Sequence, residues 1–302
     1  MRRRTLSMET RGVLFIALAS LQFGTVVVLG KITERHLPVP SMLAVRFAFA
    51  AAVLVAALLV RGEPVLPAPG ERIRLALLGA LFYAPESMLF FLAAKHGTAA
   101  ATTLLFFTYP VVVAFAWWAI GRGAPGWLLG ASLACATSGA AIVVAASGRF
   151  SISGLGVVFA LSASVSFSAY LILADLVLKR TPPLAGAMWV SVWAAVFLVV
   201  FAVAAGEAQS PGVGAQWLRL LGMGAATAGA FVCLFVGLRR IGPVRTAVVA
   251  ATEPLATTVL AAIFLSEPIR GPVAVGGVLI LIGAVTASLA RARAAAVDPP
   301  VP

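Results

Sequence analysis

The stretch GVLFIALASLQF, residues 12–23, recurs 144 positions later as GVVFALSASVSF, residues 156–167. Gly, Val, Phe, Ala, Ser and Phe return in place without a gap. Rarer residue types also match at this offset: Pro38 and Pro182, Phe91 and Phe235, Lys95 and Arg239, Thr102 and Thr246, Thr108 and Thr252, Pro110 and Pro254, and Gly139 and Gly283. A constant offset of this kind indicates a fold built from two similar units. We therefore expect one repeat over 1–150 and a second over 151–302.

The composition predicts a membrane protein. Hydrophobic residues make up 62% of the 302 residues and charged residues 11%, and the mean hydropathy is +1.06. Soluble domains carry about 25% charged residues. The apolar residues form long runs, whereas a membrane β-barrel shows short alternating segments. The sequence therefore predicts an all-α polytopic protein in the lipid bilayer.

The net charge of +12 does not indicate a nucleic-acid partner, because the basic residues stand singly or in pairs between apolar runs. Two cysteines, Cys135 and Cys233, lie inside apolar segments, and two histidines, His36 and His96, lie at segment ends. This distribution offers no cluster for a metal or for catalysis. We expect no metal, no cofactor and no enzymatic activity.

Apolar runs of spanning length predict ten transmembrane helices. They are expected at 12–33, 40–60, 73–94, 98–120, 125–147, 153–177, 184–205, 216–238, 244–265 and 272–290. With a cytoplasmic N-terminus, the inner segments carry 15 Lys and Arg residues and the outer segments 6. This positive-inside bias predicts that both termini are cytoplasmic and that the protein spans the plasma or inner membrane.

Five helices in each repeat have a topological consequence. Because five is odd, the second repeat enters the bilayer from the opposite side, so the two repeats are inverted. Inverted repeats are typical of secondary transporters, whose substrate sites lie near the bilayer midplane. The pattern therefore favours transport by alternating access.

The stretch TEPLATTVLAAIFLSEPIRGPVAVGGVLILIGAVTAS, residues 252–288, resembles the EamA-type branch of the drug/metabolite transporter superfamily. The resemblance covers about 10–292 and rests on Glu253-Pro254, Glu267, the Gly-rich last helix and the two five-helix halves. The first half departs from the pattern: Tyr109-Pro110 replaces Glu-Pro, and GRGAPGW lacks the acid that Glu267 supplies. The resemblance implies export or exchange of small metabolites, often amino acids.

Glu253 and Pro254 lie near the middle of the ninth expected helix. Pro254 has no N–H group, so the carbonyl of Ala250 loses its helical partner. A free carbonyl beside a carboxyl group could bind an ammonium group, a hydroxyl or a proton, which makes protons a candidate coupling ion. The alternative is a structural kink in which a neutral Glu253 bonds to a neighbouring helix.

Tyr109 and Pro110 occupy the matching position in the first repeat and would free the carbonyl of Phe106. Two proline-broken helices at matching depth would line one central cavity. The alternative is a pair of kinks used only for packing.

Arg46 and Glu86 are charged residues at similar depth in the second and third expected helices. A charge inside the bilayer costs about 2.5–3.5 kcal/mol on insertion scales, so each needs a partner. A structural ion pair is one interpretation, and binding of a substrate carboxylate by Arg46 is the other.

Five further residues are candidate substrate contacts. Gln22 and Ser166 match at the 144 offset, and Tyr170 follows Ser166 by one helical turn. Trp189 and Trp193, one turn apart, form either an aromatic wall or an interfacial anchor. For the serines, packing or a bond to their own backbone is the alternative.

A secondary transporter for a small metabolite explains these features best. The motif GxxxxGK[ST] is absent, so an ion or substrate gradient is the expected driving force. A structural or sensory membrane protein would explain the hydrophobicity but not the repeat. The oligomeric state stays open.

Overall fold

A computed structural model describes residues 7–34, 36–97, 99–123, 126–146, 152–212, 214–265 and 271–297. The regular elements within these residues are helices, and one isolated β-bridge joins Gly97 to Ile152. Glu267 lies outside the described residues. So do six of the cations used to predict the topology, namely Arg2, Arg3, Arg4, Arg35, Arg149 and Arg270.

The helices begin and end within a few residues of the apolar runs in the sequence. In the first half they are α1 (Met8–Thr33), α2 (Val39–Arg61), α3 (Arg72–Leu77), the π-helix η1 (Leu78–Tyr83), α4 (Ala84–Lys95), α5 (Ala99–Phe106), α6 (Tyr109–Ala119) and α7 (Trp127–Ala146). In the second half they are α8 (Gly154–Val177), α9 (Pro183–Ala204), α10 (Ala215–Ile241), α11 (Pro243–Ala250), α12 (Glu253–Leu265) and α13 (Gly271–Val297).

Three of the expected helices are composite. The run 73–94 consists of α3, η1 and α4, the run 98–120 of α5 and α6, and the run 244–265 of α11 and α12. Among the described residues, seven helical segments are long and apolar enough to cross a membrane, the last being Pro243–Phe264. Tyr109–Ala119, Trp127–Ile142 and Ala274–Ala287 are shorter apolar helices. The chain is thus a multi-pass helical membrane protein.

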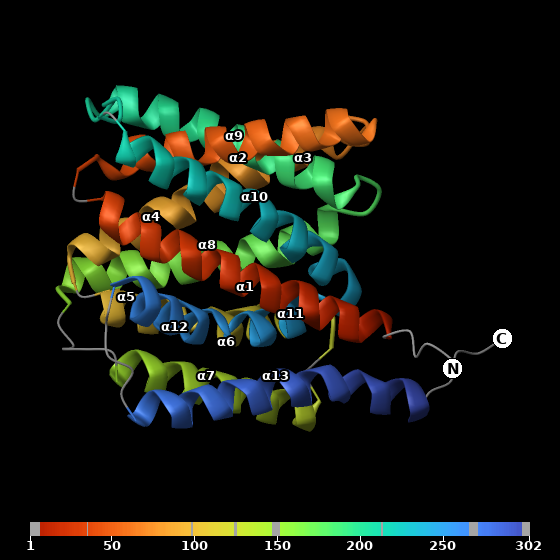
Figure 1. Cartoon of the computed structure of the whole chain (residues 1–302). Coiled ribbons are helices and arrows are strands. Elements are labelled where there is room, and N and C mark those ends of the chain that lie inside the picture. The colour runs from red at the N-terminus through yellow and green to blue at the C-terminus, as the bar shows by residue number, and fades with distance from the viewer. Residues whose placement is uncertain are drawn as a thin grey trace, which may run out of the picture.

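Helix packing follows the internal repeat. α1 packs most extensively on α10, α8 on α4, α2 on α9, and α7 on α13 (Figure 1). At the 144 offset α1 corresponds to α8, and α10 to the segment from α3 to α4. Exchanging the halves therefore converts one set of contacts into the other, as expected for two repeats packed around an approximate two-fold axis.

Two glycines allow equivalent helix crossings in the two halves. A Cβ atom on Gly79 of η1 would lie 2.4 Å from the carbonyl oxygen of Val190 on α9. One on Gly224 of α10 would lie 3.0 Å from the carbonyl oxygen of Arg46 on α2. Small residues permit such close backbone approach in membrane bundles. Because positions 46 and 190 differ by 144, these are the same crossing seen in each repeat.

The outer surface of the bundle is apolar. Leu14, Val158, Val203 and Phe264 are all at least half exposed, with exposed fractions of 52%, 57%, 65% and 70%. They come from α1, α8, α9 and α12, so apolar side chains face outward on several sides of the bundle. Such a surface suits hydrocarbon rather than water. The first turn of α1 and the last turn of α13 lie at the same end of the bundle (Figure 1).

Candidate functional site

The same type of hydrogen-bonded turn occurs at both helix interruptions. The Thr108 hydroxyl donates to the carbonyl oxygen of Leu105 at 2.7 Å, and the Thr252 hydroxyl donates to that of Val249 at 2.9 Å. Pro110 and Pro254 are each the second residue of the helix that follows, where a missing N–H costs no hydrogen bond. Each helix is therefore interrupted just before its proline, and the proline begins the new helix.

The carbonyl group of Ala250, expected to lose its helical partner, has a contact from another helix. The Ser20 hydroxyl of α1 donates to its oxygen over 3.4 Å. Ser164, the repeat counterpart of Ser20 on α8, lies 3.0 Å from the hydroxyl oxygen of Thr108. A serine of the first helix of each repeat thus contacts the interrupted helix of the other repeat, so both interruptions are supported in a similar way.

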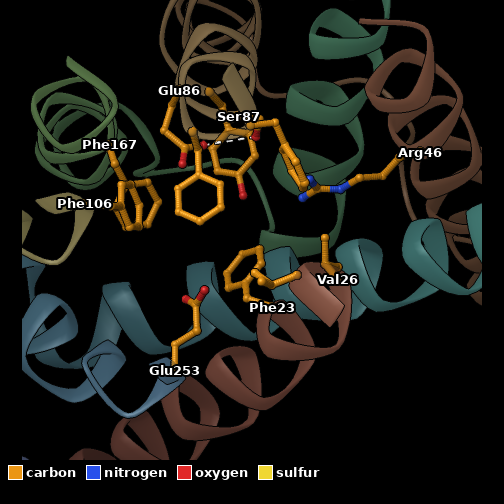
Figure 2. A pocket seen from close by; sticks show the side chains of 12 residues that line it. Phe23, Val26, Arg46, Glu86, Ser87, Phe106, Phe167 and Glu253 are labelled. Atoms are coloured by element: carbon orange, nitrogen blue, oxygen red, sulfur yellow. Dashed lines mark hydrogen bonds between the residues drawn. The ribbon is translucent and has the colours of Figure 1, made fainter. Parts of the chain in front are cut away.

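A central cavity lies beside the start of α12, between elements of both halves (Figure 2). Its empty volume is about 470 Å³, including the part that opens outward. Six of its lining residues are aromatic, and the others include two glutamates and an arginine. The full lining is Phe23, Val26, Val27, Arg46, Tyr83, Glu86, Ser87, Phe90, Phe91, Phe106, Phe167 and Glu253.

Arg46 reaches the cavity from α2 and is buried, with 3% of its surface exposed. Its Nε donates to the Thr227 hydroxyl of α10 at 2.8 Å, and its guanidinium carbon lies 4.7 Å from the centre of the Phe47 ring. These contacts fix the base of the guanidinium group, and Tyr83 is a further hydrogen-bond partner of this side chain. A guanidinium group in this position suits an acceptor such as a carboxylate.

Glu86 and Glu253 face the same space from opposite sides. Figure 2 shows the Glu86 carboxylate entering from α4 and that of Glu253 from the start of α12, with Arg46 on a third side. Glu86 accepts a 3.1 Å hydrogen bond from the Ser87 hydroxyl. Within the described residues no ion pair of 4 Å or less joins Arg46 to either glutamate, although Arg46 interacts electrostatically with both. The three groups therefore surround a shared space instead of closing on one another.

Tyr109 and Tyr170 are fully packed beside the cavity without lining it. The Tyr109 ring is 4.9 Å from that of Phe167 and 5.3 Å from that of Phe106, which both line the cavity. Tyr170 is 4.9 Å from the ring of Tyr83. Neither tyrosine hydroxyl has a hydrogen-bond partner among the described residues. Both residues support the cavity wall from behind.

Four other sequence candidates lie away from the cavity. The Gln22 amide donates to Leu18 O at 3.1 Å and approaches the Cys233 sulfur at 3.7 Å, so it lies between α1 and α10. Ser166 donates to Phe82 O of η1 at 2.8 Å. These two positions fill equivalent interfaces in the two repeats.

The tryptophans lie on the outer part of α9. The Trp189 indole donates to Arg72 O at 2.9 Å, which joins α9 to the start of α3. The Trp193 ring lies 6.4 Å from it and is 37% exposed. They join two elements of the bundle and do not reach the cavity.

Sequence reasoning missed several members of the site. Tyr83 and the phenylalanines of the lining look like ordinary residues of a membrane helix in the sequence. Thr227 is uncharged, so the sequence gives no reason to expect it beside Arg46. One signal was available, because Phe23 and Phe167 are a matched pair of the repeat. Both line the cavity.

Metal-binding side chains do not gather in the described residues. No group of three or more His, Cys, Asp or Glu residues there could hold a metal ion. The cavity instead presents two carboxylates, one guanidinium group and aromatic rings, which suits an organic solute with polar and apolar parts.

Comparisons with known proteins agree with this architecture. The profile of the EamA-like transporter family matches twice, at residues 10–145 and 154–289. A solved crystal structure of another protein matches with a TM-score of 0.78 and 21% sequence identity, covering 93% of this chain and 98% of that chain. This likeness shows the fold. A search of the curated proteins found no match. Since the profile covers nearly the whole chain in two repeats, the protein belongs to the EamA-like transporter family and is a membrane transporter of the drug/metabolite transporter type.

Proposed function

We propose that this protein is a secondary transporter that moves a small metabolite, an amino acid or a similar solute, by alternating access. The observation that carries the proposal is the central cavity between the two repeats, with Glu86, Glu253 and Arg46 on its wall. Export is the direction that the family resemblance implies. The membrane is the plasma or inner membrane, and the repeats are units 1–150 and 151–302.

The cavity supplies complementary groups for each part of such a solute. The carboxylates of Glu86 and Glu253 suit an ammonium group, and the guanidinium group of Arg46 suits a carboxylate. The aromatic rings of the lining provide apolar contact and interact favourably with a cation. Protons are the coupling ion in this proposal. Glu253 and Glu86 are buried acids, and a bound solute could displace a proton from either of them.

The topology in this proposal has ten transmembrane helices in two inverted five-helix repeats, with both termini cytoplasmic. Two observations support it. The predicted inner segments carry 15 basic residues against 6 in the outer ones. The pairing of α1 with α10 and of α8 with α4 exchanges when the halves are exchanged.

Counterflow in liposomes tests the function. The full-length protein is reconstituted, loaded with single amino acids and related amines, and assayed for exchange beside Glu253→Gln. We expect exchange of at least one solute, and a loss of about tenfold or more in Glu253→Gln, because an ammonium group loses a charge-assisted bond.

Two controls interpret that result. Glu63→Gln changes a partly exposed loop glutamate paired with Arg61 at 2.6 Å, and this variant should exchange solute normally. Glu253→Asp keeps the charge and should retain more activity than Glu253→Gln. If no solute exchanges under any gradient, the transporter proposal fails; if Glu253→Gln exchanges normally at every pH, Glu253 has no role in transport.

A further inference from the structure

One end of the bundle, away from the central cavity, contains a dense polar junction between the two repeats. Glu71 precedes α3 in the first repeat, and residues 178–181 connect α8 to α9 in the second. The cavity residues of the first repeat come later, from Tyr83 to Phe91. At about 1.5 Å per residue, Tyr83 lies roughly 18 Å along the helix from Glu71. The junction and the cavity are therefore separate sites at different depths.

The Glu71 carboxylate is buried in this junction and accepts four hydrogen bonds from the opposite repeat. Oε1 accepts from the backbone N–H groups of Lys179 at 3.3 Å and Arg180 at 2.9 Å. Oε2 accepts from the N–H of Thr181 at 2.9 Å and from its hydroxyl at 2.5 Å. The Thr181 hydroxyl oxygen in turn accepts from the N–H of Ala68 at 3.0 Å. One side chain thus binds three consecutive residues across the repeat boundary.

Arg239, at the end of α10, holds the same connection from its carbonyl side. Its Nε donates to Leu178 O at 2.9 Å and its terminal nitrogen donates to Thr181 O at 2.6 Å. The segment 178–181 therefore has its N–H groups bound by a carboxylate and its carbonyl groups bound by a guanidinium group. The Glu71 carboxylate is buried, whereas Arg239 is partly exposed to solvent. Because each charge meets complementary backbone groups, the junction is specific.

An aromatic layer separates the junction from the cavity. It consists of Tyr83, Tyr170, Phe231 and Phe235, with ring centres 4.5 Å apart for Tyr83 and Phe231 and 4.9 Å apart for Tyr83 and Tyr170. Each ring is at most 3% exposed. On α8 the order along the chain is Phe167 of the cavity, Tyr170 of the layer, and then the junction. Two packed layers, the aromatic rings and the junction, therefore follow the cavity toward this end of the protein.

We propose that Glu71 and residues 178–181 form a latch that holds this end of the transporter closed, and that its release, with parting of the aromatic layer, opens the cavity toward this end. The proposal rests on alternating access as the transport mechanism. In the proposed topology this end is cytoplasmic, so the latch holds the cytoplasmic side shut.

The charge state of Glu71 agrees with a latch. Burial raises the pKa of the Glu71 carboxyl group, but the hydrogen bonds from the Thr181 hydroxyl and from the N–H groups of Arg180, Thr181 and Lys179 lower it by more. The net result is a pKa below the ordinary value of 4.5. The carboxylate is therefore ionised at neutral pH and its hydrogen bonds are at full strength.

The corresponding junction at the other end of the bundle has different chemistry. There the Ser41 hydroxyl of α2 donates to Glu207 O at 2.6 Å and accepts from the N–H of Gln209 at 3.0 Å. Residues 207 and 209 belong to the connection between α9 and α10, the repeat counterpart of the connection that contains Glu71. The position matching Glu71 is Ala215. The Glu71 carboxylate therefore has no acidic counterpart at the matching position of the second repeat.

Cysteine accessibility tests the latch without requiring a known substrate. In full-length protein with Cys135→Ala and Cys233→Ala, a reporter cysteine replaces Ala174, which is fully buried and one turn from Tyr170 on the same face of α8. We expect Glu71→Gln and Thr181→Val to raise its reaction rate with a membrane-impermeant maleimide about tenfold or more, because loss of charge-assisted bonds favours local opening.

Two matched controls separate latch release from general loosening. Glu63→Gln removes a charge from the same loop, outside the latch, and should leave the rate unchanged. A second reporter at Ala136, buried between α7 and α13, should stay unreactive in every variant. An unchanged rate at residue 174 in Glu71→Gln, or an equal rise at residue 136, would overturn the latch.

The outcome is independent of the transport assay. Faster labelling at residue 174 in a protein that exchanges no solute would support the latch and contradict the proposed transport function. Normal solute exchange with unchanged labelling would support transport and contradict the latch.

Discussion

Buried glutamates are used in two ways in this protein. Glu71 has both carboxylate oxygens bound by N–H and hydroxyl groups of residues 179–181. Glu253 instead faces a cavity that it shares with Glu86 and Arg46. A carboxylate with all its hydrogen bonds made has a structural role, whereas carboxylates facing a common space are available to a ligand. In the two proposals above, the same residue type serves closure at one site and substrate recognition at the other.

The pH dependence of stability should separate Glu71 from other acids. Its pKa in the folded protein is lowered, so its stabilising effect is full above the ordinary pKa of 4.5 and is lost as the pH falls through the lowered value. We expect wild type to unfold at a higher temperature than Glu71→Gln by a constant margin from about pH 8 to about pH 5. The margin should shrink in more acidic solution, as measured by thermal unfolding in detergent.

A margin that shrinks between neutral pH and pH 5 would contradict this assignment. Glu63→Gln provides the comparison, since Glu63 is partly exposed and bonded to Arg61 in its own segment.

At the level of single residues, charge was the informative signal in the sequence. Arg46, Glu86 and Glu253 stand out because ionised groups are rare in apolar helices, and all three line the cavity. Gln22 and Ser166 carried a weaker signal and lie at helix interfaces, since a neutral polar group can satisfy itself with a backbone carbonyl. Tyr83 gave no signal, because only the packing reveals which aromatic rings face a cavity.

Among the elements, the crossing of η1 with α9 depends on the absence of a side chain. A Cβ atom at Gly79 would meet the backbone oxygen of Val190 at 2.4 Å, and backbone cannot rotate away as a side chain does. We expect Gly79→Ala to lower stability by about 1–3 kcal/mol, as overpacking does. A lower unfolding temperature in detergent would measure it.

Gly130→Ala on α7 is the matched control, because a Cβ atom there meets nothing within 4 Å. Equal unfolding temperatures for the two variants would show that the bundle adjusts at the η1 crossing without cost.

The elements also show where pattern reading reaches its limit. Hydrophobic runs located the helices within a few residues, because each run must satisfy its backbone inside the bilayer. The runs did not reveal η1 or the exact interruption points. The helix breaks were expected at Pro110 and Pro254, but the turns lie at Thr108 and Thr252. A proline fits the first turn of a helix, so it marks a new start as readily as an end.

For the whole molecule, the proposed topology can be tested by labelling intact cells. In cysteine-free protein, an impermeant maleimide should label Gln209→Cys in the connection between α9 and α10, which is expected outside. It should not label Arg293→Cys near the C-terminus, which is expected inside. Labelling of residue 293 alone before cell lysis would invert the orientation. Labelling of both residues would contradict the three spans expected between residues 209 and 293.

The repeat was the strongest whole-molecule signal in the sequence, and its physical basis is visible in the packing. Residues 144 apart occupy equivalent crossings, as Arg46 and Val190 do, so similar residues are needed at both. The sequence alone does not show which departures from the repeat matter for function. Ala215 at the position that matches Glu71 looks like any other mismatch until the bonds of Glu71 to residues 179–181 are seen.

That mismatch has a kinetic consequence. If both ends of the transporter were sealed equally, the empty protein would divide its time evenly between its two conformations. Because the position that matches Glu71 is Ala215, the carboxylate latch is not repeated in the second half, and we expect the two populations to be unequal. The empty protein should therefore dwell with its cytoplasmic side shut, which limits leakage of solutes through it. Breaking the hydrogen bonds of Glu71 would then be the rate-limiting step of each transport cycle.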